Sequence, residues 1–341
     1  MARILITGAA GFIGTHVRNA AESRGHHAIG LDSLRPDVHR GRSIARNDTL
    51  IGDVRDTTAL ASALRGVDVV VHLAAKVGLG VDIHDYPDYA STNVHGTAVV
   101  LSEMARAGVA RLVLASSMVV YGEGLGHCAE HGAVTPAPRR ETDLASGRFE
   151  PPCPVCGREL EPRLVGEAAP IDPRNAYAAS KLAQEHLATS WARETHGAVT
   201  ILRYHNVYGP GLPAGTPYAG VAALFLDALN SGAPPQVNED GMMRRDFVHV
   251  ADIASATLAA AENCDGTQIY NVGSGVVRTV GELASALADE MGGPSPVISG
   301  RYRMGDVRHI TADASRIQRE LGWVPTMPFD VGIADLVNAH A

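Results

Sequence analysis

The sequence predicts an α/β protein with a doubly wound parallel sheet, a smaller mixed α/β lobe and one long insertion. Short apolar runs alternate with helical patterns through the first half of the chain, which is typical of β–α–β units in a parallel sheet. The alternation stops over residues 122–172, which are rich in proline, glycine, cysteine and charge, and it resumes at residue 176. After residue 210 strand and helix patterns are mixed. We therefore expect a larger domain over 1–209, containing the 122–172 insertion, and a smaller lobe made mainly from 210–341.

The apolar patterns place the individual elements. In the first half we expect strands over 4–6, 27–31, 67–73, 112–115 and 199–204. The helices between them are expected over 13–23, 60–64, 94–107 and 176–193. In the second half, helical patterns cover 219–230, 253–261, 280–291 and 314–321. Doubly wound folds bind ligands beyond the carboxyl ends of their strands, so we expect the smaller lobe to close over that edge.

Composition excludes several classes of protein. With 341 residues, 45% of them hydrophobic and 19% charged, the chain is long enough for two domains with a large core. Its formal charge of -8 and the absence of a lysine- or arginine-rich run argue against a nucleic-acid partner. The longest apolar stretch is interrupted by Asp68, His72 and Lys76, so we expect no membrane helix. The first residues lack the features of a signal peptide, and we expect a cytoplasmic protein.

Three glycines follow the first expected strand. Gly8, Gly11 and Gly14 occupy the turn that opens the first helix. Glycines there permit a tight turn and let backbone N–H groups approach a pyrophosphate at the positive end of the helix. Asp32 ends the second strand, where an acidic side chain accepts hydrogen bonds from the adenosine ribose and repels a 2′-phosphate. The pattern predicts a Rossmann-type site for NAD rather than NADP.

Further cofactor contacts are expected along the same edge of the sheet. Asp53 and Val54 follow the third strand and are candidates to meet the adenine, the alternative being a turn aspartate exposed to water. Lys76 follows a buried strand and is a further candidate for a cofactor contact. The alternative is that its side chain extends to solvent. Beyond the glycines and Asp32, the full expected set is Phe12, Ile13, Asp53, Val54, Leu73, Ala74, Ala75, Lys76, Asn93, Tyr177, Lys181 and Tyr204.

A tyrosine and a lysine at helical spacing are candidate acid–base groups. Tyr177 and Lys181 begin one helix and lie one turn apart on the same face. A phenol has a pKa of about 10 and is a poor base at neutral pH, but an adjacent ammonium and a positively charged nicotinamide both favour the phenolate. Ser117 ends another strand, where its hydroxyl would complete a hydrogen-bonding pair with Tyr177 around the reacting oxygen. Chance occurrence of a tyrosine and a lysine at this spacing is the alternative.

Together these motifs resemble a known enzyme family. The resemblance is to extended short-chain dehydrogenases/reductases of the nucleotide-sugar epimerase and dehydratase group. It rests on the glycine triplet, Ser117, the Tyr177 and Lys181 pair, and the segments 202–210, 245–250 and 270–273. It covers nearly the whole chain. It implies that Tyr177 is the base, that Lys181 supports the base and the nicotinamide ribose, and that Ser117 hydrogen-bonds the sugar oxygen.

The resemblance also implies a nucleotide-sugar site and an assembly. Met118, beside Ser117, matches a position at the sugar. Four other residues match positions that hold the nucleoside diphosphate, namely Asn206, Arg245, Arg303 and Asp306. His205 departs from the bulky apolar residue usual in this family, which leaves open how that segment meets the cofactor. In the resembling family the helices corresponding to 94–107 and 177–193 pair across a two-fold axis, so a homodimer is expected.

One departure from the family pattern bears on the type of reaction. Sugar 4,6-dehydratases of this family carry an Asp-Glu pair directly after the hydroxyl residue, where this chain has Met118 and Val119. Neither of these side chains can transfer a proton. The expected reaction is therefore NAD-dependent 4-epimerisation of a dTDP- or UDP-hexose or deoxyhexose through a 4-keto intermediate. A dehydratase or reductase of the same family is the alternative. A catalytically silent NAD or nucleotide-sugar sensor with a zinc interaction loop is the alternative from another class.

The insertion carries a metal-binding pattern. Cys128 and His131 form a Cys-x-x-His pair, and Cys153 and Cys156 form a Cys-x-x-Cys pair about 20 residues further on, which is the spacing of a structural zinc ribbon. We expect these four residues to bind one zinc, with His127 as the substitute ligand, because the insertion has few large apolar residues to order it. Unligated thiols and surface histidines are the alternative. The insertion and the segment 303–309 are most similar to those of the deoxysugar epimerases that interconvert dTDP-L-rhamnose and its 4-epimer.

Overall fold

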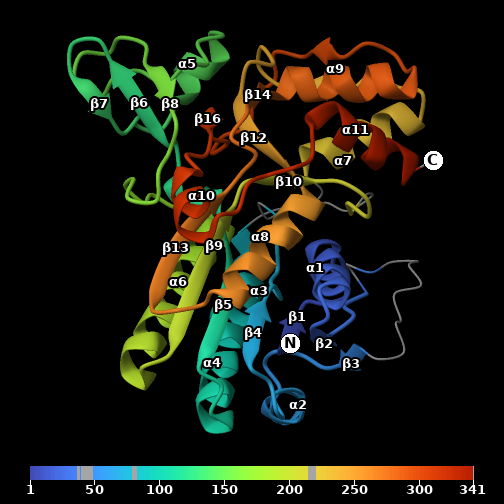
Figure 1. Ribbon diagram of the computed structural model, residues 1–341. Helices are drawn as coiled ribbons and strands as arrows, with labels where there is room; N and C mark the ends of the chain where they lie inside the picture. The colour runs from blue at the N-terminus through green and yellow to red at the C-terminus, as the bar shows by residue number, and fades with distance from the viewer. Residues whose placement is uncertain (37–38, 40–48, 79–82, 214–219, 341) are drawn as a thin grey trace.

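A seven-stranded parallel sheet forms the centre of the molecule. The computed structural model describes residues 1–36, 39, 49–78, 83–213 and 220–340. Every pair of neighbouring strands in the large sheet is parallel. The spatial order is β13 (Thr267–Val272), β9 (Ala198–Tyr204), β5 (Arg111–Ser117), β4 (Val69–His72), β1 (Arg3–Thr7), β2 (His27–Asp32) and β3 (Thr49–Ile51) (Figure 1). This confirms the doubly wound parallel sheet predicted from the alternating pattern.

Helices cover both faces of this sheet. On one face α1 (Phe12–Ser23) packs against α8 (Val250–Glu262), and both contribute to one apolar cluster. On the other face α4 (Gly96–Ala107) packs between α2 (Thr57–Ala63) and α6 (Ala176–Thr195) around a second cluster. The short helices α3 (Tyr86–Tyr89) and η2 (Ala90–His95) lead into α4. Since successive strand side chains point to opposite faces, Ile4 and Ile6 of β1 enter the first cluster and Leu5 enters the second.

A smaller lobe lies beyond the carboxyl ends of the strands (Figure 1). Its mixed sheet consists of β10 (Asn206–Tyr208), β12 (Arg244–His249), β14 (Val277–Thr279) and β16 (His309–Ile310). Three helices pack around its core: α7 (Val221–Asn230), α9 (Val280–Met291) and α11 (Phe329–Asn338). A two-stranded pair joins β11 (Gln236–Val237) to β15 (Val297–Ile298). The helix α11 was not expected from the sequence.

The division of the chain at residue 209 is less simple than expected. Both β13 and α8 follow residue 209, yet β13 is the seventh strand of the large sheet and α8 packs on it. The helix α10 (Ser315–Leu321) packs against β13 as well. The chain therefore crosses between the two layers more than once.

The 122–172 insertion has a fold of its own. It contains three short antiparallel strands in the order β7 (Gly132–Val134), β6 (Leu125–Cys128), β8 (Glu161–Arg163). The single-turn helix α5 (Glu141–Ala145) lies between β7 and β8 in the chain. No strand was expected there, because segments of three or four residues are too short to display an alternating pattern. The buried cluster of this small sheet holds only Cys128, Cys153 and Leu160. Figure 1 shows the insertion and the smaller lobe at the same end of the large sheet.

None of the helices in the described part of the chain is both long enough and apolar enough to cross a bilayer.

Candidate functional site

The glycine turn after β1 requires residues without a side chain. Gly8 has a φ of +70°, and a Cβ on it would lie 2.8 Å from the backbone nitrogen of Ala74. A Cβ on Gly14 would collide with the carbonyl oxygen of Gly8. The Gly8 N–H donates to Leu31 at 2.8 Å, which fixes the turn to β2. The first turn of α1, with Phe12 and Ile13, therefore starts directly above the sheet edge, where its free N–H groups attract an anion.

Asp32 meets this turn as predicted from its position at the end of β2. Its carboxylate accepts hydrogen bonds from the backbone N–H groups of Ala10 and Leu34, each at 2.9 Å. The residue is buried. The structure thus brings the expected ribose-binding carboxylate and the glycine turn into direct contact.

Two other charged residues of the expected cofactor set have protein partners. The Asp53 carboxylate pairs with Arg55 at 2.6 Å, and this hydrogen bond lowers the pKa of Asp53. The Lys76 ammonium pairs with Asp85 at 2.8 Å and with Asp88 at 2.9 Å. The side chains of Asp53 and Lys76 are therefore held by local ion pairs, whereas neighbouring Val54 is buried in the core.

The segment after β4 is attached to both the glycine turn and α6. The Ala74 N–H donates to the Thr7 hydroxyl at 3.2 Å, so residues 73–75 lie beside the turn. Asn93 is fully buried; it accepts from the Lys76 N–H at 2.7 Å and donates to the Ser180 hydroxyl at 2.8 Å. The Tyr204 phenol is buried against the Thr257 hydroxyl at 2.7 Å, so its side chain lies within the core.

Ser117 and Tyr177 come together at the carboxyl end of β5. The side chain of Asn175 accepts a hydrogen bond from Ala178 at 2.9 Å and so starts α6 immediately before Tyr177. The Ser117 side chain lies close enough to the Tyr177 phenol to lower the pKa of that phenol. Burial raises the pKa of Tyr177 to about 12, against the lowering effect of Ser117. The chain alone therefore keeps Tyr177 protonated at neutral pH.

Lys181 lies beneath this pair in a dry environment. Its ammonium donates to the carbonyl oxygen of Ala115 at 2.7 Å, and the residue is 3% exposed. Burial lowers the pKa of Lys181 to about 8, although the charge of Glu185 acts to raise it. The carboxylate of Glu185 is held in turn by Arg203 at 2.7 Å. Lys181 is thus held in one position, and its ammonium loses its proton at a lower pH than that of an ordinary lysine.

The smaller lobe supplies the expected substrate residues. Arg245 donates to the carbonyl oxygens of Arg244, Val307 and Arg308, and it thereby holds the segment that carries Arg303 and Asp306. Burial lowers the pKa of Arg245 to about 10. Two residues that follow β9 have buried atoms without a partner in the described part of the chain, namely Oδ1 of Asn206 and both ring nitrogens of His205. Buried polar atoms of this kind are rare in folded proteins, so these two residues are candidates to be completed by a bound molecule or a water.

A pocket opens between the insertion and the segment 304–306. Its volume is about 230 Å³. It is lined by Glu123, Pro138, Arg139, Leu144, Arg174, Met304, Gly305 and Asp306. Of these, only Asp306 was expected to contact a ligand. The others were not expected because most of them belong to the insertion, where the only motif is the metal-binding pattern and none marks a substrate contact.

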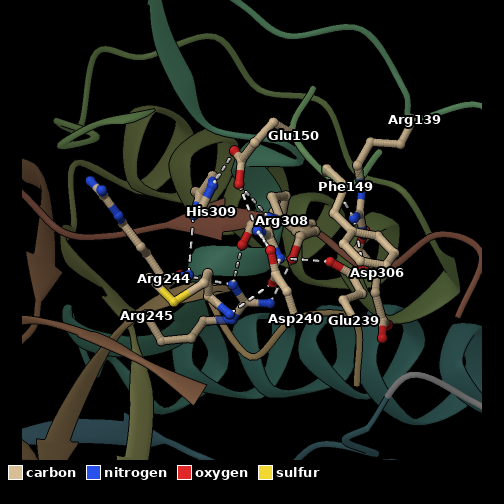
Figure 2. A network of polar contacts seen from close by, with 12 residues as sticks. Arg139, Phe149, Glu150, Glu239, Asp240, Arg244, Arg245, Asp306, Arg308 and His309 are labelled. Atoms are coloured by element: carbon tan, nitrogen blue, oxygen red, sulfur yellow. Dashed lines mark hydrogen bonds and ion pairs between the residues drawn. The ribbon is translucent and has the colours of Figure 1, made fainter. Parts of the chain in front are cut away.

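A buried network of charges joins the insertion to the smaller lobe (Figure 2). Arg308 is at its centre and contacts Glu150 of the insertion at 2.6 Å, Glu239 at 2.8 Å and Asp240 at 2.7 Å. Arg139 of the insertion contacts Glu239 at 2.7 Å, and both side chains are almost completely buried. Losing one partner of a buried ion pair typically costs about 3–5 kcal/mol, so this network fixes the insertion against the lobe.

The four predicted metal ligands of the insertion form one cluster. The ligand atoms of Cys128, His131, Cys153 and Cys156 all lie within 4.8 Å of one another. The sulfurs of Cys128 and Cys156 are 3.6 Å apart. Hydrogen bonds from backbone N–H groups lower the pKa of the Cys128 thiol, which favours the thiolate that metals bind. His127 precedes Cys128 on β6 and therefore points to the opposite face of that strand.

Comparison with known proteins gives consistent results over the whole chain. The chain matches the NAD dependent epimerase/dehydratase family over residues 4–152 and 153–273. It is 33% identical to the dTDP-L-rhamnose 4-epimerase of Burkholderia thailandensis, covering 98% of this chain and 93% of that protein. It is 32% identical to the UDP-glucose 4-epimerase of Mycolicibacterium smegmatis, covering 98% and 97%.

Solved structures agree with these relatives. The Thermus thermophilus UDP-glucose 4-epimerase, solved with NAD, superposes with a TM-score of 0.79 at 27% identity, covering 99% of this chain and 98% of that one. The dTDP-glucose 4,6-dehydratase DesIV of Streptomyces venezuelae, solved with NAD, has a TM-score of 0.78 at 28% identity, covering 99% and 96%. Overall similarity therefore does not separate epimerases from dehydratases, and the residues of the site must do so.

Proposed function

The chain belongs to the NAD dependent epimerase/dehydratase family of extended short-chain dehydrogenases/reductases, and from this premise we propose that it is an NAD-dependent nucleotide-sugar 4-epimerase. The proposed substrates are dTDP- or UDP-linked hexoses or deoxyhexoses, the classes named for its relatives. The observation that carries the proposal is the proximity of Ser117 to the Tyr177 phenol, with the buried Lys181 one turn further along α6. This arrangement supplies one exchangeable proton and one group to hold a sugar oxygen, which is what oxidation and re-reduction of one carbon require.

The residues present fit NAD. The glycine turn offers backbone N–H groups to a pyrophosphate, and Asp32 offers a carboxylate to the adenosine ribose. When bound, NAD supplies a hydride acceptor and a positive charge in the nicotinamide ring. We assign the remaining contacts to the strand ends that carry Val54, Leu73, Ala74, Ala75 and Asn93.

In the proposed reaction Tyr177 takes the proton of the sugar 4-hydroxyl as the carbon is oxidised. Ser117 holds the sugar oxygen throughout, and Tyr177 returns the proton once the keto sugar has presented its other face. Because burial raises the pKa of Tyr177, the phenolate needs nearby positive charge, and Lys181 supplies part of it. Asn206, Arg245, Arg303 and Asp306 are assigned to the nucleoside diphosphate.

The residues after Ser117 favour epimerisation over dehydration. Met118 packs against the buried cluster of Val120, Tyr121, Val165 and Ile310, and Val119 is equally apolar. Loss of water from the sugar requires a proton donor and a base beside the reacting carbons. Met118 and Val119 provide neither.

We further propose that the insertion binds one structural zinc through Cys128, His131, Cys153 and Cys156. A tetrahedral site with Zn–S bonds of about 2.3 Å holds two sulfurs about 3.8 Å apart. The Cys128–Cys156 separation of 3.6 Å is close to this value. A closed site with four protein ligands has no position for substrate, so its role is to order the insertion.

The test of the proposed function is a product assay. Purified protein is incubated with NAD and with UDP-glucose or dTDP-L-rhamnose, and the nucleotide sugars are separated by chromatography. The expected product is the 4-epimer, with no net accumulation of reduced cofactor. A stoichiometric yield of reduced cofactor would identify a dehydrogenase, a 4-keto-6-deoxy sugar would identify a dehydratase, and binding without any turnover would contradict an enzymatic role.

A further inference from the structure

The pocket between the insertion and the segment 304–306 is too small for a whole nucleotide sugar. Sites that enclose a drug-sized ligand typically measure about 300–1,000 Å³. At about 230 Å³ this pocket takes a single ring or group of similar size. Its walls come from Glu123 on one side, Arg139 and Leu144 of the insertion on another, and Asp306 opposite.

Two arginines present unused donors at this pocket. The Nε–H groups of Arg139 and Arg174 are buried and have no partner in the described part of the chain. The Arg139 side chain is only 4% exposed. The other nitrogens of both residues are occupied: Arg139 donates to Glu239 at 2.7 Å and to the Asp306 carbonyl at 2.7 Å, and Arg174 pairs with Asp172 at 2.6 Å. The two guanidinium groups are therefore held in fixed orientations, and the Nε–H of each still lacks a hydrogen-bond acceptor.

Two carboxylates face these donors. Glu123 is 6% exposed, and one of its oxygens accepts a hydrogen bond from the Arg308 N–H at 3.1 Å. A carboxylate has about four acceptor positions, so most of those on Glu123 stay available. Burial raises the pKa of Glu123 and of Asp306. Hydrogen bonds donated by a ligand would therefore stabilise the charged form of both carboxylates.

The balance of charge decides which ligand fits. The two arginines of the lining are already paired with Glu239 and Asp172, so the pocket offers no unpaired arginine charge to an anion. A hydroxyl group both donates and accepts hydrogen bonds, and several hydroxyls on one ring match donors and acceptors on opposing walls. Pro138, Leu144 and Met304 add apolar surface, which suits the C–H face of a sugar ring.

The pocket adjoins the reacting groups along the chain. Glu123 follows Ser117 after the short helix η3 (Met118–Tyr121), and Arg174 comes just before α6, which carries Tyr177. The two segments touch, since a Cβ on Gly122 would lie 3.2 Å from Nε of Arg174. Two residues of the pocket lining therefore lie in the segments that directly follow Ser117 and directly precede Tyr177.

We propose that this pocket binds one polyhydroxylated ring of the nucleotide sugar and that the insertion thereby contributes to sugar specificity. The donors are the Nε–H groups of Arg139 and Arg174, and the acceptors are the carboxylates of Glu123 and Asp306. The network in Figure 2 holds Arg139 in place through Glu239 and so prepares the pocket before the ligand arrives. This inference rests on the proposed function, because it names a subsite for the substrate of that reaction. The ring is either the hexose or the ribose of the nucleoside, which share this chemistry.

The test measures binding rather than turnover. Arg174→Ala and Glu123→Gln are compared with two controls in the insertion, Arg140→Ala and Glu161→Gln. The side chains of Arg140 and Glu161 are 75% and 77% exposed, and neither lines the pocket. Dissociation constants are measured by calorimetry for UDP-glucose against UDP, and for dTDP-L-rhamnose against dTDP, on variants that retain the wild-type melting temperature. Arg139→Lys, which keeps the charge beside Glu239 but removes Nε, is a third variant.

A lost hydrogen bond to a charged group is expected to weaken binding about tenfold or more. If the pocket holds the hexose, the pocket variants lose this factor for the nucleotide sugars but bind UDP and dTDP as wild type does. If it holds the ribose, both members of each pair weaken equally. If the pocket variants bind all four ligands with the same dissociation constants as Arg140→Ala and Glu161→Gln, the proposed subsite is wrong. Wild-type protein that binds a nucleotide sugar without epimerising it would overturn the proposed function and leave the subsite standing.

Discussion

Ser117 lies beside the phenol of Tyr177 and acts to lower its pKa, although the whole 122–172 insertion separates the two residues in the chain. The contact arises because β5 and α6 meet at the carboxyl edge of the sheet. If this pair carries the proton in both directions of the reaction, Tyr177→Phe should lower turnover by about two orders of magnitude or more. The variant should keep its melting temperature and its affinity for NAD. Turnover close to wild type would refute the mechanism.

Cofactor preference should depend on Asp32. Its carboxylate lies at the glycine turn, where it repels the extra phosphate of NADP and occupies the space for it. We expect NAD to bind at least about tenfold more tightly than NADP, and Asp32→Ala to reduce that ratio. The matched control is Asp53→Ala, which removes a carboxylate already paired with Arg55 and should leave the ratio unchanged. Equal affinity of the wild type for NAD and NADP, measured by fluorescence titration, would show that Asp32 has been given the wrong role.

Lys181 should destabilise the cofactor-free protein at neutral pH. Burial lowers its pKa from 10.5 to about 8, so below pH 8 the native state holds a charge in a dry site. Between pH 8 and 10.5 the native state has lost this proton and the unfolded state still binds it, so stability rises with pH across that window. Lys181→Met should therefore raise the free energy of unfolding at pH 7 by roughly 1 kcal/mol, and the gain should shrink toward pH 10.5.

Denaturant unfolding of both proteins at several pH values measures this difference. Tyr177 is present in both, so its own titration cancels from the comparison. The same substitution should abolish epimerisation. A gain in stability that stays constant across the pH range would show that the charge on Lys181 is not its cause.

The insertion should contain one zinc per chain after purification without chelator. Cys153→Ser combined with Cys156→Ser should release the metal, make the insertion sensitive to protease, and weaken binding of the nucleotide sugar more than binding of NAD. Cys264→Ser is the control, because that thiol is buried elsewhere and donates to the Leu112 carbonyl. Elemental analysis well below one zinc per chain, with the insertion still resistant to protease, would rule out the metal site.

The proposed assembly is a homodimer through α4 and α6, which pack side by side on one face of the sheet. Light scattering at micromolar concentration should therefore give about twice the mass of one chain. A mass near 35.8 kDa would contradict the dimer.

The sequence predicts the central strands of the large sheet well because they are buried on both faces, whereas no range was given for the edge strands β3 and β13, and Ile51 of β3 is 75% exposed. Leu5 and Ile6 must both be apolar when each face is covered by helices, so β1 is visible as a continuous apolar run. The glycine turn, Asp32 and the Ser117–Tyr177 pair were predicted for a similar reason, since each is fixed by local backbone geometry at a strand or helix end.

The charge network and the new pocket could not be predicted in this way. Arg308 meets Glu150 and Glu239 only after three distant segments have folded against one another. Nothing in the local pattern distinguishes Arg139 from the exposed Arg140 beside it. Likewise α11 was missed, because its packing depends on a lobe whose other parts come from far along the chain.

The ion pairs of Arg308 also limit how the insertion can be engineered. An inserted segment that folds by itself can be deleted or moved to another protein without harm to its host. This one contributes Arg139 and Glu150 to a cluster in which Glu239 and Arg308 are almost fully shielded from water, while Asp240 lies at its edge. Cutting it out would open that cluster to solvent, and transplanting it would leave two charged side chains without their counterparts. An engineered exchange between related proteins must therefore replace the insertion and the smaller lobe together.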